Sequence, residues 1–150
     1  MKREKLVQFT RILLEFMFYS GILVIISLPF SLRALGESFM PIFLEYYWVM
    51  LFIFAIGGIL ALVILFHLKR IMKTVVEKNC FVKANVLSLR WMGLFSFLIS
   101  LTFLIRLFFQ TTPATFLIIL TFFVAGLFCL VLAQVFAEAV RYKEENELTI

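Results

Sequence analysis

Four long apolar segments, separated by short polar ones, dominate the hydrophobic pattern of this chain. They cover approximately residues 13–32, 47–67, 91–109 and 114–137. A helix needs about 20 predominantly apolar residues to cross the hydrocarbon core of a bilayer, and each segment is close to that length. Because lipid offers no hydrogen-bond partner to an open strand edge, each segment must be helical. The pattern predicts an all-α integral membrane four-helix bundle that forms one membrane domain over residues 1–150.

The polar segment between the second and third spans, residues 68–90, shows helical periodicity of its own. Apolar residues recur there at helical spacing, with charged residues between them. The apolar residues are Leu68, Ile71, Met72, Val75 and Val76. We expect the second span to continue below the membrane as an amphipathic helix, to turn near Asn79 and Cys80, and to return through a second helix. Residues 68–90 would then form a cytoplasmic helical hairpin, and residues 138–150 a cytoplasmic tail.

Basic residues lie almost entirely on one side of the predicted spans. Twelve of the fourteen lysines and arginines precede the first span, lie between the second and third, or follow the fourth; the exceptions are Arg33 and Arg106. Since basic residues are retained in the cytoplasm, this asymmetry predicts a multi-pass protein of the cytoplasmic (plasma) membrane with both termini inside. The formal net charge of +5 then indicates contact with a lipid bilayer whose inner leaflet is anionic, and no direct contact with nucleic acid.

The composition supports a membrane location and gives little support for chemistry. Hydrophobic residues make up 64% of the chain and charged residues 15%, whereas about a quarter of a soluble domain is charged. The two cysteines, Cys80 and Cys129, provide neither a disulfide framework nor a metal-ligand spacing. The sequence contains no phosphate-binding glycine loop, nucleophile elbow, zinc-binding helix motif or pair of acids. We therefore expect no cofactor, no metal and no enzymatic activity.

Two side chains within or beside the spans, Arg106 and His67, are candidates for a functional role. An intramembrane charge such as Arg106 is by default a functional hypothesis. Arg106 also lies near the predicted outer end, where its long side chain can reach the headgroups or pair with Glu37 or Glu45. Structural anchoring and recognition of a ligand or ion both stay open for it. No residue of a metal-ligating type lies four positions before or after His67. An interfacial role is therefore favoured over pH sensing or metal or haem binding.

Two stretches of the sequence resemble a known family. In residues 81–93 the matching positions are Phe81, Asn85, Val86, Leu89, Arg90 and Gly93. Residues 144–150 resemble the usual ending of that family, which consists of acids and Asn followed by Leu-Thr and a β-branched residue. The chain thus resembles the YoaS-like proteins, small bacterial four-span membrane proteins that form a domain of unknown function. Such proteins are commonly encoded beside a small helix-turn-helix regulator of the Cro/C1 type, which the resemblance implies as a partner.

Two functions compete for this chain. The first is a regulatory or sensor protein that binds a cytoplasmic partner, such as a helix-turn-helix transcription regulator, through the hairpin and tail. The candidate partner-binding residues are Lys73, Val76, Phe81, Asn85 and Arg90. A hairpin that only packs on itself or lies on lipid is the competing interpretation of the same residues. The alternative function is transport of a small solute by a homo-oligomer, or service as an accessory subunit of a transporter, supported by Arg106 and Pro29.

Overall fold

The computed structural model describes residues 2–149, which form helices and turns with no strand. The helices are α1 (Lys2–Ser38), α2 (Ile42–Glu45), α3 (Tyr47–Val76), α4 (Lys83–Arg106) and α5 (Pro113–Thr149). All except the short α2 are long and apolar enough to cross a membrane. The predicted all-α fold with four spanning helices is confirmed, and the chain is a multi-pass membrane protein.

Most of the spanning helices are longer than the apolar segments that predicted them. α1 begins eleven residues before its apolar segment and continues through Pro29 to Ser38. α5 continues to Thr149, so the predicted tail is helical. These flanks are rich in Lys, Glu and Arg, which are good helix formers, and Pro29 lies within the apolar segment of α1. The third apolar segment differs, because α4 ends at Arg106, three residues before the predicted boundary at 109.

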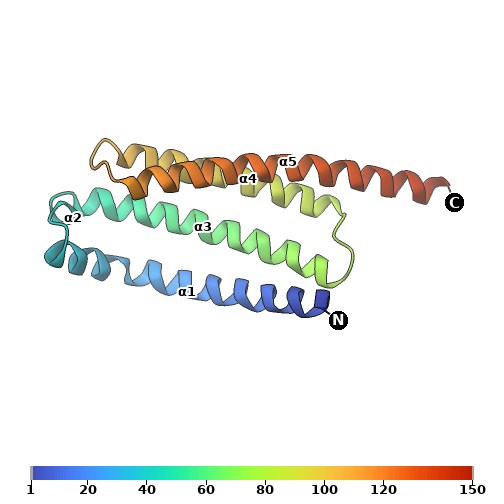
Figure 1. Ribbon diagram of the computed structural model, residues 1–150, viewed down its shortest axis with the longest axis horizontal. Helices are drawn as coiled ribbons and strands as arrows, with labels where there is room; N and C mark the ends of the chain where they lie inside the picture. Colours follow the sequence, from blue (N-terminus) through green and yellow to red (C-terminus); the bar gives the residue numbers. More distant parts are fainter. Residues whose placement is uncertain (1, 150) are drawn as a thin grey trace.

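The spanning helices pack in the order in which they occur in the chain. α1 packs against α3, α3 against α4, and α4 against α5 (Figure 1). Within residues 2–149, no Cα atom of α1 lies within 8 Å of α4 or α5, and none of α3 lies that close to α5. The short α2 contacts the ends of α1 and α3. The bundle is therefore a row with two inner helices, α3 and α4, and two outer helices, α1 and α5.

The inner helix α4 is the most buried of the spanning helices. In its most apolar window 44% of the residues are buried, against 6% for α1. Its buried positions include the polar residues Asn85, Ser88, Ser96 and Ser100. The hydroxyl of Ser100 donates a hydrogen bond to the carbonyl of Ile119 on α5, over 3.0 Å. Small and hydroxyl-bearing residues let spanning helices approach closely and bond to each other, which explains why the polar face of α4 points inward.

Glycines set the distance between neighbouring helices. A Cβ atom on Gly57 would lie 2.8 Å from the ring of Phe103, where α3 meets α4. A Cβ atom on Gly93 would lie 3.1 Å from the side chain of Leu130 and 3.2 Å from the carbonyl oxygen of Gly126, where α4 meets α5. At these points the helices are too close for a larger side chain.

One end of the molecule carries the start of α1, the turn between α3 and α4, and the end of α5 (Figure 1). We call it the basic end, and it comprises residues 2–11, 68–90 and 138–149. α5 projects beyond the other helices there (Figure 1). The opposite end holds α2 and the short connection between α4 and α5. An even number of spans places both termini on the same side of a bilayer, and the charge asymmetry predicts that this side is the cytoplasm.

Candidate functional site

The turn at the basic end joins α3 to α4 over residues 77–82. The amides of Lys78 and Asn79 donate hydrogen bonds to the carbonyls of Val75 and Thr74, at 3.1 and 3.0 Å. This is the Schellman pattern of helix termination, which requires a left-handed residue just after the cap. Lys78 supplies that residue with φ 59°, although glycine adopts this conformation at less cost. The turn also contains Cys80, as the sequence predicts.

Asn85 holds the hairpin together from inside. Its side-chain amide donates hydrogen bonds to the hydroxyl of Thr74, at 2.7 Å, and to the carbonyl of Cys80, at 2.6 Å. The side chain is 2% exposed, so it connects the end of α3, the turn and the start of α4. The structure thus gives Asn85 a positioning role and leaves little of its surface for a partner. Sequence periodicity could not show this, because it does not reveal that Thr74 faces Asn85 across the turn.

The other four predicted partner-binding residues are exposed and dispersed. Val76 is 40% exposed and Phe81 44%, and both Lys73 and Arg90 are exposed. Phe81 also contacts the ring of Phe136 on α5, edge to face, with the ring centres 5.3 Å apart. Each of the four lines a different hollow around the basic end. The structure therefore does not gather them into one pocket.

The end of α5 packs beside the hairpin and forms polar contacts with it. The ammonium group of Lys143 donates a hydrogen bond to the side-chain oxygen of Asn79, at 2.7 Å. The ammonium group of Lys83 lies 3.4 Å from a carboxylate oxygen of Glu144. Exposed ion pairs contribute little stability each, but these two contacts place the last helix beside the turn. Sequence reasoning identified residues 138–150 only as a tail, since nothing local shows that its charges pair with the hairpin.

Arg106, the last residue of α4, is 5% exposed. One of its terminal nitrogens donates a hydrogen bond to the hydroxyl of Thr115, and the other lies 3.4 Å from the side-chain oxygen of Gln110. The guanidinium carbon is 5.1 Å from the ring centre of Phe54 and 6.0 Å from that of Phe43. These contacts come from α2, α3 and α5 as well as the chain just after α4. Arg106 thus joins most of the elements at the opposite end of the molecule.

The expected pairing of Arg106 with Glu37 or Glu45 does not form. In the part of the chain that the structure describes, Arg106 has no ion pair. The side chain is packed beside the rings of Phe43 and Phe54 and does not extend out from the surface of the protein. Its position at the negative end of the α4 dipole favours a positive charge there. Of the two interpretations that the sequence leaves open, this geometry favours structural anchoring.

His67 has the surroundings of a packed side chain. Its ring stacks on that of Phe95, with the centres 6.2 Å apart, and Nδ1 is buried without a hydrogen-bond partner. Among residues 2–149, no group of three His, Cys, Asp or Glu side chains is placed to hold a metal ion.

Comparisons with known proteins identify the chain at the level of a family. No curated protein and no solved structure matches it. The sequence model of one family, described as "Protein of unknown function (DUF2975)", matches residues 36–150. The match agrees with the expected domain of unknown function, while the YoaS-like name and the paired regulator do not follow from it. Since it covers the end of α1 and all of the later helices, the chain belongs to the DUF2975 family of proteins of unknown function.

Proposed function

We propose that this protein is a non-enzymatic regulatory or sensor protein that binds a cytoplasmic protein through its hairpin and the end of α5. The observation that carries the proposal is the exposure of large apolar side chains at the basic end. Four of them, Val76, Phe81, Tyr142 and Leu148, are 40%, 44%, 59% and 87% exposed. Lipid chains cover apolar residues inside the spans, but these four lie among charged residues outside the apolar segments. Removing such exposed apolar surface from water favours association with another protein.

The shape of the basic end supports this proposal. The last turns of α5 project past the turn between α3 and α4 (Figure 1). Tyr142 and Leu148 on this projection are among the most exposed apolar side chains outside the spans. A projecting helix with exposed apolar residues has the form of the ligands that lie in a groove of another protein.

The charges of the projecting helix suggest the chemistry of the partner. Residues 144–147 contain three glutamates, at positions 144, 145 and 147, of which Glu144 also pairs with Lys83 and Glu145 with Arg141. Such a segment complements a basic protein surface, and a basic surface is the electrostatic feature of DNA-binding proteins. A small helix-turn-helix regulator, which the family resemblance implies, has this chemistry. Held by the acidic segment, the regulator would have less of its basic surface available for DNA.

Photo-crosslinking in living cells tests the proposal. A photoreactive residue at Leu148 or at Phe81 should capture one and the same soluble protein with a basic surface. The matched control is the same probe at Leu23 on α1, which is 68% exposed but lies within the first apolar segment. It should capture lipid or other membrane proteins. Capture of only lipid or copies of this chain from all three positions would refute the proposal.

The captured protein then gives a direct binding measurement. Full-length protein in lipid nanodiscs should bind it, and Phe81→Asp or Leu148→Glu should weaken binding tenfold or more, as truncation of central interface residues does. Leu23→Ala should leave the affinity unchanged. If the two variants bind more weakly but the transcripts controlled by the partner do not change in cells, the regulatory part of the proposal is wrong.

A further inference from the structure

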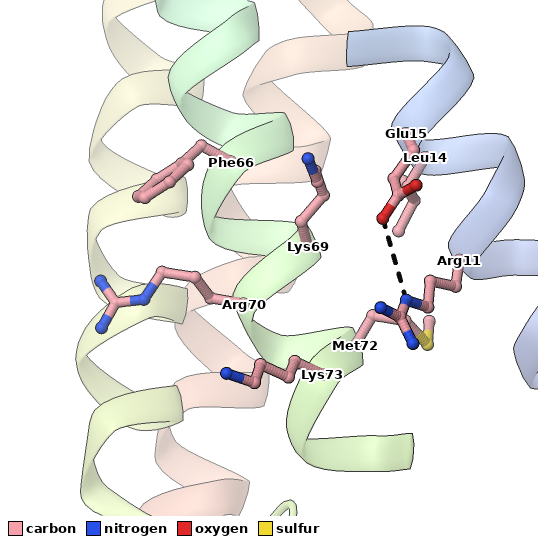
Figure 2. Close-up of a pocket in the computed structure, with 8 residues that line it drawn as sticks. All are labelled: Arg11, Leu14, Glu15, Phe66, Lys69, Arg70, Met72 and Lys73. Carbon is pink, nitrogen blue, oxygen red and sulfur yellow. Dashed lines mark ion pairs between the residues drawn. The ribbon is translucent and has the colours of Figure 1, made fainter. Parts of the chain in front are cut away.

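α1 and α3 form a groove of about 220 Å³ at the basic end (Figure 2). Its lining contains four basic residues, Arg11, Lys69, Arg70 and Lys73, and one acid, Glu15. The groove is therefore strongly positive.

The basic residues of the groove have few carboxylate partners. Within residues 2–149, none of the three on α3 forms an ion pair. Lys69 and Lys73 are four residues apart on one helix, where like charges repel. Nε of Arg11 is 3.8 Å from a carboxylate oxygen of Glu15, and both side chains are about half exposed. This long pair leaves the other N–H groups of Arg11 available, so an anion in the groove would relieve the repulsion.

Two of these cations point into the space between the helices. Figure 2 shows Arg11 and Lys69 extending there, whereas Arg70 and Lys73 extend from α3 to its other side. The ammonium group of Lys69 lies 4.7 Å from the ring centre of Phe18 on α1. This ring contact holds Lys69 toward α1, on the membrane side of Arg11. Arg11 and Lys69 thus face the same groove from α1 and α3 (Figure 2).

The level of the groove matches the surface of a bilayer. Arg11 lies two residues before the first predicted span, which starts at 13, and Lys69 lies two residues after the second, which ends at 67. The backbone of both residues therefore lies just outside the hydrocarbon core, near the depth of lipid phosphates.

The remaining walls of the groove are apolar. Leu14 on α1 is 6% exposed, and Phe66, which is 49% exposed, extends from α3 on the same side as Arg70 (Figure 2). Further into the membrane α1 and α3 touch, since a Cβ atom on Gly21 would lie 2.8 Å from the side chain of Leu62. A ligand with a charged head and an apolar body fits these walls better than a free ion.

We propose that this groove binds the phosphodiester headgroup of an anionic phospholipid. Arg11 and Lys69 contact the phosphate oxygens from α1 and α3, Arg70 and Lys73 attract the lipid, and its acyl chains continue into the membrane along the apolar surface of α1. Charge-assisted hydrogen bonds from Arg and Lys to phosphate are strong, and basic pockets between spanning helices suit acidic headgroups. This is a defined site between two helices, and it differs from the general attraction of basic residues to an anionic leaflet.

Lipid titration followed by native mass spectrometry tests the site. Full-length protein in neutral detergent is titrated separately with phosphatidylglycerol, phosphatidylcholine and inorganic phosphate. Near a membrane surface each basic residue contributes enough for about a fivefold change in affinity, so Arg11→Gln with Lys69→Gln should weaken phosphatidylglycerol binding about thirtyfold. Lys69→Arg keeps the charge and should bind within about threefold of the original protein.

The control is the double variant Lys2→Gln with Lys5→Gln. It removes the same amount of charge from exposed positions of α1 outside the groove, and it should bind phosphatidylglycerol as the original protein does. Equal weakening in the two double variants would overturn the proposal in favour of general attraction. Equal affinity for phosphatidylcholine would overturn it as well. Binding of inorganic phosphate that depends on Arg11 and Lys69, without such dependence for the lipid, would assign the groove to free phosphate instead.

Discussion

The side-chain amide of Asn85, at the start of α4, donates a hydrogen bond to the hydroxyl of Thr74, near the end of α3, over 2.7 Å. Because Asn85 is 2% exposed, water cannot easily replace this bond. We predict that Asn85→Ala lowers the free energy of unfolding by about 1–3 kcal/mol, since it leaves buried acceptors without their donor. Denaturant unfolding of the full-length protein in detergent measures the change.

A double-mutant cycle isolates the bond between these two residues. Thr74→Val should cost less than Asn85→Ala, because the carbonyl of Cys80 keeps its donor. The coupling energy between the two substitutions should be about 1 kcal/mol. Ala84→Ser, at an exposed neighbouring position, serves as the control and should change stability by less than about 0.5 kcal/mol. A coupling energy near zero would contradict the proposed role of Asn85.

Lys78 occupies a backbone conformation that suits glycine better. Its φ of 59° brings Cβ close to the following carbonyl, which costs about 1–2 kcal/mol for most residues. Lys78→Gly should therefore raise the melting temperature, with a gain of about 0.5–1 kcal/mol after the extra chain entropy of glycine is subtracted. Lys78→Ala removes the same charge but keeps Cβ, and it should give little or no gain. If both variants were stabilised equally, the effect would come from the charge.

Arg106 should stabilise the fold through its fork of donors and its two aromatic neighbours. We expect Arg106→Ala to lower the free energy of unfolding by about 3 kcal/mol, from lost hydrogen bonds, lost ring contacts and a new cavity. Arg106→Lys keeps the charge beside the rings but cannot bond to Thr115 and Gln110 together. It should therefore lower the free energy of unfolding by about half as much as Arg106→Ala does. Unfolding in denaturant compares the variants.

Arg33 provides the control for Arg106. It is the other arginine outside the basic end, it is exposed, and its guanidinium carbon lies 5.4 Å from the ring centre of Tyr47. Arg33→Ala should cost no more than about 1 kcal/mol, as expected for an exposed cation beside a ring. Similar costs for Arg33→Ala and Arg106→Ala would argue against an anchoring role that depends on burial.

The contact between α4 and α5 should tolerate no methyl group at Gly93. The added Cβ would lie 3.2 Å from the backbone oxygen of Gly126, and backbone cannot rotate away as a side chain can. Overpacking of about 1–3 kcal/mol should exceed the gain of about 1 kcal/mol that alanine normally brings to a helix. At Gly58 the added Cβ would meet only side-chain atoms, Cγ1 and Cδ1 of Ile25 at 3.0 and 3.1 Å, and no backbone atom. Gly93→Ala should therefore melt below the original protein and Gly58→Ala at or above it, and the reverse order would contradict this account.

The spans were predictable because the hydrophobicity and length of a segment decide whether it can cross a bilayer. A segment such as 47–67 must be helical wherever it meets hydrocarbon, and it lies within α3. The helical spacing of Leu68, Ile71 and Val75 likewise predicted that α3 continues past the membrane. Both inferences use only local sequence, which is why they agree with the structure.

The side-chain partners were not predictable in this way. Asn85 and Arg90 both belong to the family motif, yet Asn85 is buried and Arg90 is exposed. In a membrane, apolar residues gain nothing by facing inward, so hydrophobicity does not show which face of α4 is covered. The bond from Arg106 to Thr115 depends on how the chain turns back after α4. Opposite charge alone therefore suggested the wrong partner for Arg106, namely a glutamate such as Glu45.

The packing of the helices in a row has a consequence for how the protein is made. Each spanning helix after the first packs against the spanning helix synthesised immediately before it. That earlier helix is therefore already in the membrane when the later one emerges from the ribosome. Contacts between segments close in sequence form fast, because little chain entropy is lost in joining them. Assembly can follow synthesis in the same order, and α1 and α3 can pair while α5 is still untranslated.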